Sequence, residues 1–284
     1  MKAAAFDYVK PKALSDALSL LEQGGDDARL IAGGQTLLAT LNMRLSEPSI
    51  LIDITDVAEL KGISVVGDKL RIGALVTHTE IEDSALVAKH APLLKAAAPH
   101  IAHRAIRNLG TWGGSLAYGD PAAEWPACSL TLQATMVIHG PSGERKIAAK
   151  DFFIDLYTTS LEPDEILVAT EIPLATSNQV FYFHELARRH GDYAVAGLAA
   201  VAEKQGGVLS HCAFTFFSVS ATPVMASAAQ DLINGQSLND QLIAQAVASA
   251  REEIDAIADI TNSAEAKTHL IGVLLERGLK HMLA

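Results

Sequence analysis

The chain has 284 residues, 49% of them hydrophobic and 19% charged, which is typical of an ordered globular protein with a core large enough for two domains. Its formal net charge of −11 disfavours nucleic acid and anionic membrane surfaces as partners. No apolar stretch reaches the ~20 residues that span a bilayer, so we expect no membrane span.

The first half of the chain predicts a mixture of helices and strands. Leu14, Ala17, Leu18 and Leu21 share one face of a helix that ends at a glycine pair. Gly67 and Asp68 mark the turn of a hairpin. In chain order we predict a helix over 13–25, a strand over 29–34, a helix over 36–45, a strand over 49–54, a hairpin over 62–74, a helix over 92–107, a turn-rich stretch over 108–126, a hairpin over 135–149 and a strand over 164–174.

The second half begins after a short polar segment, residues 175–179, where we place the domain boundary. A long hairpin follows over 192–220 and turns at Gly206 and Gly207, and its aromatic run "FTFF" is expected in the core. Helices are predicted over 223–234, 237–258 and 263–283. The fold class is therefore α+β.

Two segments of the form small–Gly–Gly–polar lie about eighty residues apart. They are "AGGQTL", residues 32–37, and "GTWGGS", residues 110–115. Consecutive backbone N–H groups without side-chain cover form nests for phosphate oxygens, and hydroxyls of Thr36, Thr111 and Ser115 add donors. The alternative is that both glycine pairs are tight turns needed for packing. Neither G-x-x-x-x-G-K-[ST] nor G-x-G-x-x-G is present, which disfavours a P-loop and a Rossmann site.

Other polar residues have simpler interpretations. His100 and His103 would share a helical face, but no third metal ligand is evident, so we predict no metal site. Cys128 and Cys212 give no disulfide framework and are expected to be buried thiols; with no apolar leader at the N-terminus, we expect a cytoplasmic protein. Asp120 either caps a following helix or contacts a ligand. The short basic clusters at 103–107, 143–146 and 187–190 are expected to lie on solvated faces or to form local ion pairs.

Four segments carry a resemblance to a known family. "AGGQTLLATLNMRLSEPSILIDI", "LRIGALVTH", "IRNLGTWGGSLAYGDPAAEWPA" and "DEILVATEIP" resemble the FAD-binding (medium) subunit of the molybdenum hydroxylase and xanthine dehydrogenase family, similar to that of aerobic carbon monoxide dehydrogenase. The resemblance extends over the whole chain. It implies a PCMH-type FAD-binding domain of two subdomains over 1–176. A smaller C-terminal α+β domain of the CO dehydrogenase flavoprotein type would follow over 177–284, with a three-stranded antiparallel sheet and helices on one face.

The resemblance also implies the cofactor site. The first glycine loop would cradle the FAD pyrophosphate, and the second would lie along the ribityl chain and the flavin. Leu167 would pack against the cofactor, and Tyr193 would reach toward the flavin ring. Trp112 and Glu124 depart from the commoner Ile or Leu and Asp, and His184–Glu185 stands where many members have a lysine that lies near the flavin. The predicted cofactor-binding residues are Ala32, Gly33, Gly34, Gln35, Thr36, Leu37, Thr111, Gly113, Gly114, Ser115, Asp120, Glu124, Leu167 and Tyr193.

Two cysteines cannot supply the four ligands of a [2Fe–2S] cluster, and nothing in the chain is a candidate for molybdopterin. The resemblance therefore implies an electron-transfer subunit that receives electrons from a [2Fe–2S] small subunit and works with a molybdenum-binding large subunit, as a dimer of heterotrimers. No catalytic residue is predicted in this chain. The alternatives are a stand-alone FAD oxidoreductase that acts on a small substrate, and a cofactor-free scaffold. Hydroxylases of CO, purines, N-heteroaromatics and aldehydes carry similar flavin subunits, and the terminal acceptor is equally open.

Overall fold

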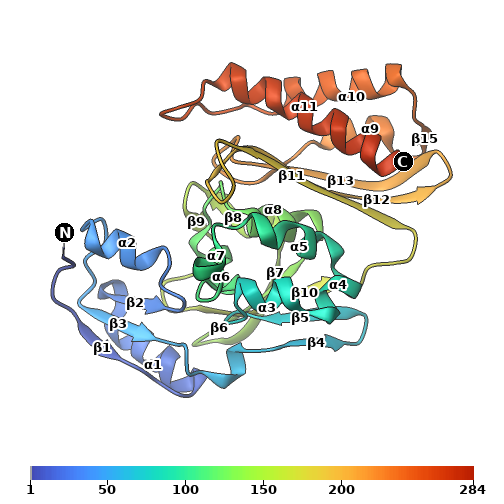
Figure 1. Cartoon of the computed structure of the whole chain (residues 1–284). Coiled ribbons are helices and arrows are strands. Elements are labelled where there is room, and N and C mark those ends of the chain that lie inside the picture. The colour runs from blue at the N-terminus through green and yellow to red at the C-terminus, as the bar shows by residue number, and fades with distance from the viewer. Residues whose placement is uncertain (1) are drawn as a thin grey trace.

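The computed structural model describes residues 2–284 and has the predicted mixture of helices and sheets (Figure 1). The N-terminal sheet is small and parallel, with β3 between β1 and β2. Helix α1 buries Ala17 and Leu21 against it, as its apolar face predicted. The elements here are β1 (Asp7–Val9), α1 (Leu14–Gly24), η1 (Gly25–Asp27), β2 (Ala28–Ile31), α2 (Leu37–Asn42), β3 (Ile50–Asp53) and η2 (Ala58–Leu60).

The second sheet is antiparallel and has the order β4-β5-β10-β6-β7. Its strands include both predicted hairpins and the strand that ends at Pro173. The strands are β4 (Ile63–Val66), β5 (Lys69–Gly73), β6 (Thr135–Gly140), β7 (Gly143–Ala148) and β10 (Ile166–Pro173), with a separate pair β8 (Phe153–Asp155) and β9 (Thr158–Thr159). The helices of this part are α3 (His78–Asp83), α4 (Ala85–His90), α5 (Pro92–Ala97), η3 (Ala98–His100), α6 (Arg104–Arg107), α7 (Trp112–Tyr118), α8 (Glu124–Thr131) and η4 (Ala149–Asp151).

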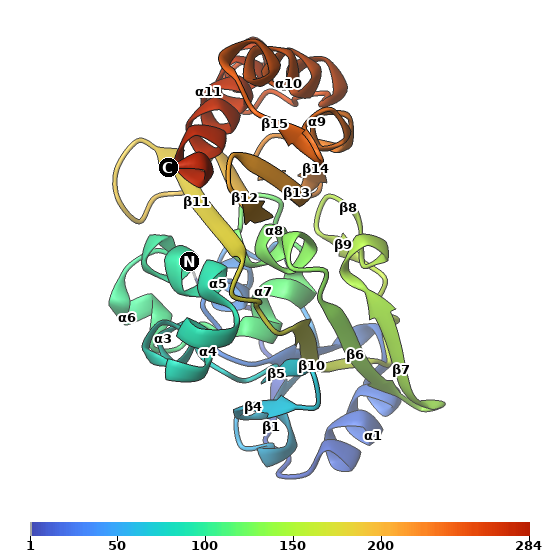
Figure 2. The ribbon, with the colours of Figure 1, turned by 90° about the vertical axis from the view of Figure 1, so that its right-hand side faces the viewer.

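The C-terminal sheet contains three long antiparallel strands, as expected, and two strands of two residues extend it. Helices α9, α10 and α11 cover one face, and α5 and α8 lie on the other, between this sheet and the second one (Figures 1 and 2). The elements are β11 (Gln179–Ala187), β12 (Ala194–Gln205), β13 (Val208–Phe217), β14 (Val224–Met225), α9 (Ser227–Ile233), β15 (Gln236–Ser237), α10 (Asp240–Glu253) and α11 (Ala264–Leu283).

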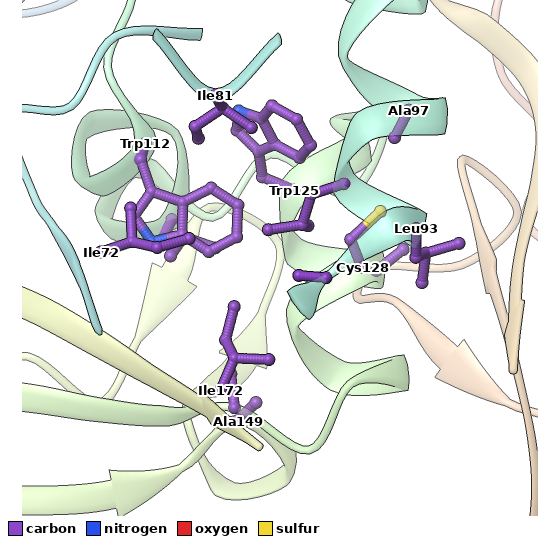
Figure 3. Packing of buried hydrophobic residues seen from close by; sticks show 14 of the residues in the cluster. Ile72, Ile81, Leu93, Ala97, Trp112, Trp125, Cys128, Ala149 and Ile172 are labelled. Atoms are coloured by element: carbon purple, nitrogen blue, oxygen red, sulfur yellow. The ribbon is translucent and has the colours of Figure 1, made fainter. Parts of the chain in front are cut away.

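The largest side chains of the central core are two tryptophans (Figure 3). The rings of Trp112 and Trp125 lie 5.1 Å apart. The indole N–H of Trp112 donates to the hydroxyl of Thr170 on β10 at 2.9 Å, so the polar atom of this buried ring is satisfied. Trp112, one of the departures from the family pattern, is thus a core residue. The aromatic run on β13 and both cysteines are also buried, as predicted.

Two sequence predictions about this region are wrong. The helix expected over 92–107 is interrupted after His100, and Ala102 adopts a left-handed backbone with φ of 42°. The buried guanidinium of Arg107 folds back to donate to the carbonyls of Ile101 and Ala102, which fixes the break. The turn-rich stretch over 108–126 contains helix α7 and the start of α8. Thr111 caps α7 by accepting the N–H of Gly114, a tertiary arrangement that composition alone does not reveal.

Candidate functional site

A cavity of about 1040 Å³ lies where the three sheets and their loops meet. All fourteen residues predicted to bind the cofactor line it, although they come from five separate segments of the chain. A second cavity of about 300 Å³ shares Ala32, Gly33, Leu75 and Thr111 with the first. The volume reaches the upper end of the ~300–1,000 Å³ found for ligand pockets, which suits a long ligand.

The first glycine loop presents backbone donors to this cavity. Within residues 2–284, the N–H groups of residues 33–37 have no hydrogen-bond partner, whereas Leu38 begins the bonding of α2 by donating to the Gly34 carbonyl. The amide of Gln35 donates to the Gly33 carbonyl at 3.0 Å and so braces the loop. Arg29 also lines the cavity, but its guanidinium donates to the carbonyls of Asp26 and Ala28. Five neighbouring free donors are what a backbone nest of the kind expected from the sequence requires.

Glycine is required at the two positions of this loop for different structural reasons. Gly34 has a φ of 69°, a left-handed conformation that glycine adopts without strain. Gly33 lies against the chain before the second glycine segment, and a Cβ there would be 1.9 Å from the carbonyl oxygen of Leu109. An added Cβ at Gly34 would face the side chains of Leu38 and Ile31. The glycines therefore shape the loop and let it approach residues 109–110.

The second glycine segment forms the first turn of α7, and its N–H groups are already used. Those of Trp112 and Gly113 donate to the carbonyls of Val76 and Ala74, and that of Gly114 donates to the hydroxyl of Thr111. A Cβ at Gly113 would be 2.4 Å from the Cβ of Ala74, so this glycine serves close packing. The expectation of a second backbone nest is wrong. This segment contributes side-chain hydroxyls to the cavity, such as that of Ser115, and at Gly114 the backbone lines the cavity without a side chain.

An acidic and aromatic group of side chains also lines the cavity. Burial, together with the nearby carboxylate of Glu185, raises the pKa of Glu124 to about 8. Burial also raises the pKa of Asp120, whose carboxylate accepts the N–H of Ala122 at 2.9 Å. Asp120 thus shapes the turn before α8 and lines the cavity as well, while Ala123 stands at the helix cap.

Tyr193 lies in this group on the loop that leads into β12. Desolvation, with the Asp120 carboxylate adding to it, raises its pKa to about 12 although 66% of the residue is exposed, so the phenol stays protonated. Tyr118 and Tyr157 line the cavity as well, and their rings lie 5.2 Å apart. Leu167 on β10 contributes a buried aliphatic wall.

His78 is a cavity residue that sequence reasoning missed. It is the first residue of α3, which begins with a capping box between Thr77 and Glu80. Burial, with a smaller effect of the Arg107 charge, lowers the pKa of His78 to about 4, so the ring is neutral. The Thr-x-x-Glu pattern is visible in the sequence and marks the start of this helix. The contact between the start of the helix and residues 110–111 forms only in the tertiary fold.

Glu185 was noted in the sequence only as part of a departure from the family pattern and was not predicted as a site residue. It is buried on β11, and one carboxylate oxygen lies 3.5 Å from Nδ1 of His100 while the other has no partner within the described residues. His100 and His103 do not share a helical face because the helix breaks between them. Among residues 2–284, no three His, Cys, Asp or Glu side chains gather in a way that could hold a metal ion.

The basic clusters form the expected local ion pairs. Arg104 pairs with Asp83 at 2.5 Å, Arg145 pairs with Glu165 at 2.6 Å, and Arg188 pairs with Asp192 at 3.1 Å. The last two carboxylates belong to residues of the cavity wall, so these pairs help to fix it. Of the helices in the described part of the chain, none is sufficiently long and apolar to cross a membrane.

Comparisons with known proteins agree with this architecture. Residues 4–175 match the family "FAD binding domain in molybdopterin dehydrogenase", and residues 181–282 match the "CO dehydrogenase flavoprotein C-terminal domain". The nicotine 6-hydroxylase medium subunit of Paenarthrobacter nicotinovorans is 38% identical, over 98% of this chain and 97% of that subunit.

Two solved structures are similar over nearly their whole length. A chain of carbon monoxide dehydrogenase from Hydrogenophaga pseudoflava superposes with a TM-score of 0.97 at 35% identity, covering 99% of this chain and 98% of that one. A chain of quinoline 2-oxidoreductase from Pseudomonas putida 86 superposes with a TM-score of 0.94 at 38% identity, covering 100% of this chain and 98% of that one.

Proposed function

Since this chain belongs to the family of FAD-binding subunits of molybdenum hydroxylases, we propose that FAD lies in the large cavity with its pyrophosphate on the N–H groups of residues 33–37. The row of free donors carries this proposal, because five neighbouring N–H groups without a protein partner can together bind the oxygens of a phosphate group. The cofactor would extend past Thr111, Gly114 and Ser115 toward Tyr193. When bound, FAD supplies the one- and two-electron chemistry of an oxidoreductase.

The residues of this chain bind and orient the cofactor. Leu167 packs against it, and the hydroxyls of Thr36 and Ser115 add donors. Glu124 holds its proton at neutral pH, so it places no negative charge beside an anionic ligand. Because no residue is assigned to substrate chemistry, electrons would reach this chain from outside.

We assign the source of electrons to a partner with [2Fe–2S] clusters, and the molybdenum cofactor to a large subunit, in a dimer of heterotrimers. The two cysteines are buried in different clusters and cannot bind such a centre. Relatives carry names such as "medium subunit" and "complex subunit alpha". The cavity rim bears exposed apolar side chains, which suits docking because interface cores are depleted in charge. They include Leu45, Ile106, Tyr157 and Tyr193.

The same proposal covers the domain boundary and the location. We place the boundary at residue 176, between β10 and β11, where the polar segment begins. We place the protein in the cytoplasm, which suits two unpaired cysteines.

Co-expression with the genes of candidate partners tests the proposal. We expect a complex that carries FAD in this chain and whose substrate bleaches the flavin absorbance. The isolated chain loaded with FAD should not react with that substrate. If it reacts as fast as the complex, the stand-alone oxidoreductase is correct; if the purified chain and the complex both lack flavin, the proposed site is wrong.

A further inference from the structure

Ser218 connects two segments of the cavity wall. It follows β13 directly and adopts a left-handed backbone with φ of 61°, which is rare for a residue other than glycine. Its N–H donates to the carbonyl of Pro121 at 2.7 Å, and its hydroxyl donates to the carbonyl of Ala194 at 2.5 Å. Pro121 lies next to Asp120, and Ala194 lies next to Tyr193. One buried serine thus joins the acidic turn to the tyrosine loop.

A buried lysine holds the third polar group of this serine. Nζ of Lys267 on α11 donates to the Ser218 carbonyl at 2.8 Å and lies 2.9 Å from a carboxylate oxygen of Asp259. Only 5% of Lys267 is exposed. The carboxylate of Asp259 in turn accepts the N–H groups of Thr261 and Asn262, so the ion pair is fixed on both sides.

The position of Lys267 opposes ordinary helix preferences. It lies near the start of α11, four residues after the cap Ser263, where the helix dipole disfavours a positive charge. Burial of the ammonium adds a desolvation penalty. Departures from local preference of this kind are common at functional sites. The three hydrogen bonds of Ser218 connect this lysine to the acidic turn and to the tyrosine loop.

We propose that Lys267, acting through Ser218, is a positioning residue that holds Tyr193 and the turn at Asp120 in the arrangement that retains the flavin. This inference rests on the proposed FAD site. Helix α11 lies on the far face of the C-terminal sheet from the cavity, so the lysine acts at a distance and does not touch the cofactor (Figure 1). The residues it positions face the flavin end of the cavity, not the pyrophosphate loop.

Lys267→Met tests the proposal, because it removes the charge and keeps most of the side-chain length. In the full chain loaded with FAD, we expect FAD to dissociate about tenfold faster, the equivalent of one lost hydrogen bond of ordinary strength. The visible circular dichroism of the bound flavin should change as well. Lys280→Met is the matched control, since Lys280 pairs with Glu276 on the exposed side of the same helix and should leave both readouts unchanged.

Two more variants separate positioning from stability. Ile271→Val removes a methyl group from the core that α11 buries, and it should lower the melting temperature but not speed FAD release. Ser218→Gly tolerates the left-handed backbone but lacks the hydroxyl, so it should speed FAD release as Lys267→Met does. If Lys267→Met fails to fold, Ser218→Gly decides the question. The inference is overturned if the wild type binds FAD while both variants release it at the wild-type rate, or if Ile271→Val speeds release equally. A wild type that binds no FAD would instead overturn the proposed function.

Discussion

The indole N–H of Trp125 donates to Nδ1 of His78 at 2.9 Å in the buried wall of the cavity. An accepting Nδ1 leaves the hydrogen of the neutral ring on Nε2. His78 is only 6% exposed, and its pKa of about 4 keeps it in this neutral form at physiological pH. The tryptophan therefore fixes both the orientation and the tautomer of the histidine.

Stability should fall in acid because of this histidine. The unfolded chain takes up a proton at about pH 6.5, whereas the folded chain does so only at about 4, so the free energy of unfolding falls as the pH drops through this window. Between pH 7 and 4.5, the wild type should lose about 2 to 3 kcal/mol more than His78→Gln, at 1.36 kcal/mol per pKa unit. Urea unfolding of both proteins at the two pH values measures the difference, and equal losses would contradict a neutral buried ring.

Gly34→Ala should reduce FAD content. The φ of 69° strains any alanine there by about 1 to 2 kcal/mol, and relief of that strain would turn the free N–H groups away from the cavity. Gly67→Ala is the control, because Gly67 has a φ of 62° in the distant turn between β4 and β5 and nothing lies within 4 Å of an added Cβ. Both variants should lose similar stability, and only the first should lose flavin absorbance. Equal flavin content in the two would argue against the loop as the pyrophosphate site.

FAD affinity should decrease as the pH rises through about 8. In the free protein Glu124 ionises in this range, and its carboxylate then repels an anionic cofactor, so the neutral form binds better. Glu124→Gln mimics the neutral acid and should bind FAD with little change between pH 7 and 9. Glu144→Gln on exposed β7 should keep the wild-type profile. A pH titration of flavin fluorescence reports the affinities, and a wild-type profile in the Glu124 variant would show that another group titrates.

Gly113→Ala should destabilise the fold. The new methyl group would meet both the Cβ and the backbone of Ala74, and overpacking of this kind costs about 1 to 3 kcal/mol. Gly143→Ala also adds a methyl group, but into open space with a φ of 97°, so it shows the effect of backbone strain alone. Thermal unfolding of the cofactor-free proteins distinguishes the two, and a Gly113 variant as stable as the wild type would refute close packing at this position.

The local parts of the fold were predictable because they depend on neighbouring residues. The hairpin turns at Gly67 and Gly206, the helix face of α1 and the apolar run of β12 all express periodicity or turn chemistry. The fourteen cavity residues were found through the family motifs. Before the resemblance, residue chemistry suggested only the two glycine pairs, the hydroxyls of Thr36, Thr111 and Ser115, and Asp120 as either a cap or a ligand contact.

What remained hidden depends on contacts distant in sequence. The break after His100 is held by Arg107, whose guanidinium donates to the carboxylate of Glu82, 25 residues away, and the helix over 112–118 is positioned by backbone bonds to Val76 and Ala74. The second glycine pair has the same sequence pattern as the first, but its N–H groups are already engaged in these hydrogen bonds. The burial of Glu185 and Lys267 was equally hidden, since a charged residue is assigned to solvent until the fold shows that it is buried.

The anion site that we propose on residues 33–37 consists of backbone dipoles within a chain of net charge −11. Such dipoles act at short range, whereas the repulsion between an acidic protein and an anionic cofactor extends over the Debye length, ~30 Å at 0.01 M salt and ~8 Å at 0.15 M. Ionic strength therefore changes the rate at which FAD encounters the protein more than it changes the stability of the bound state. Added salt should speed the capture of FAD and barely alter its release, the opposite of what it does at a site made of lysine and arginine side chains.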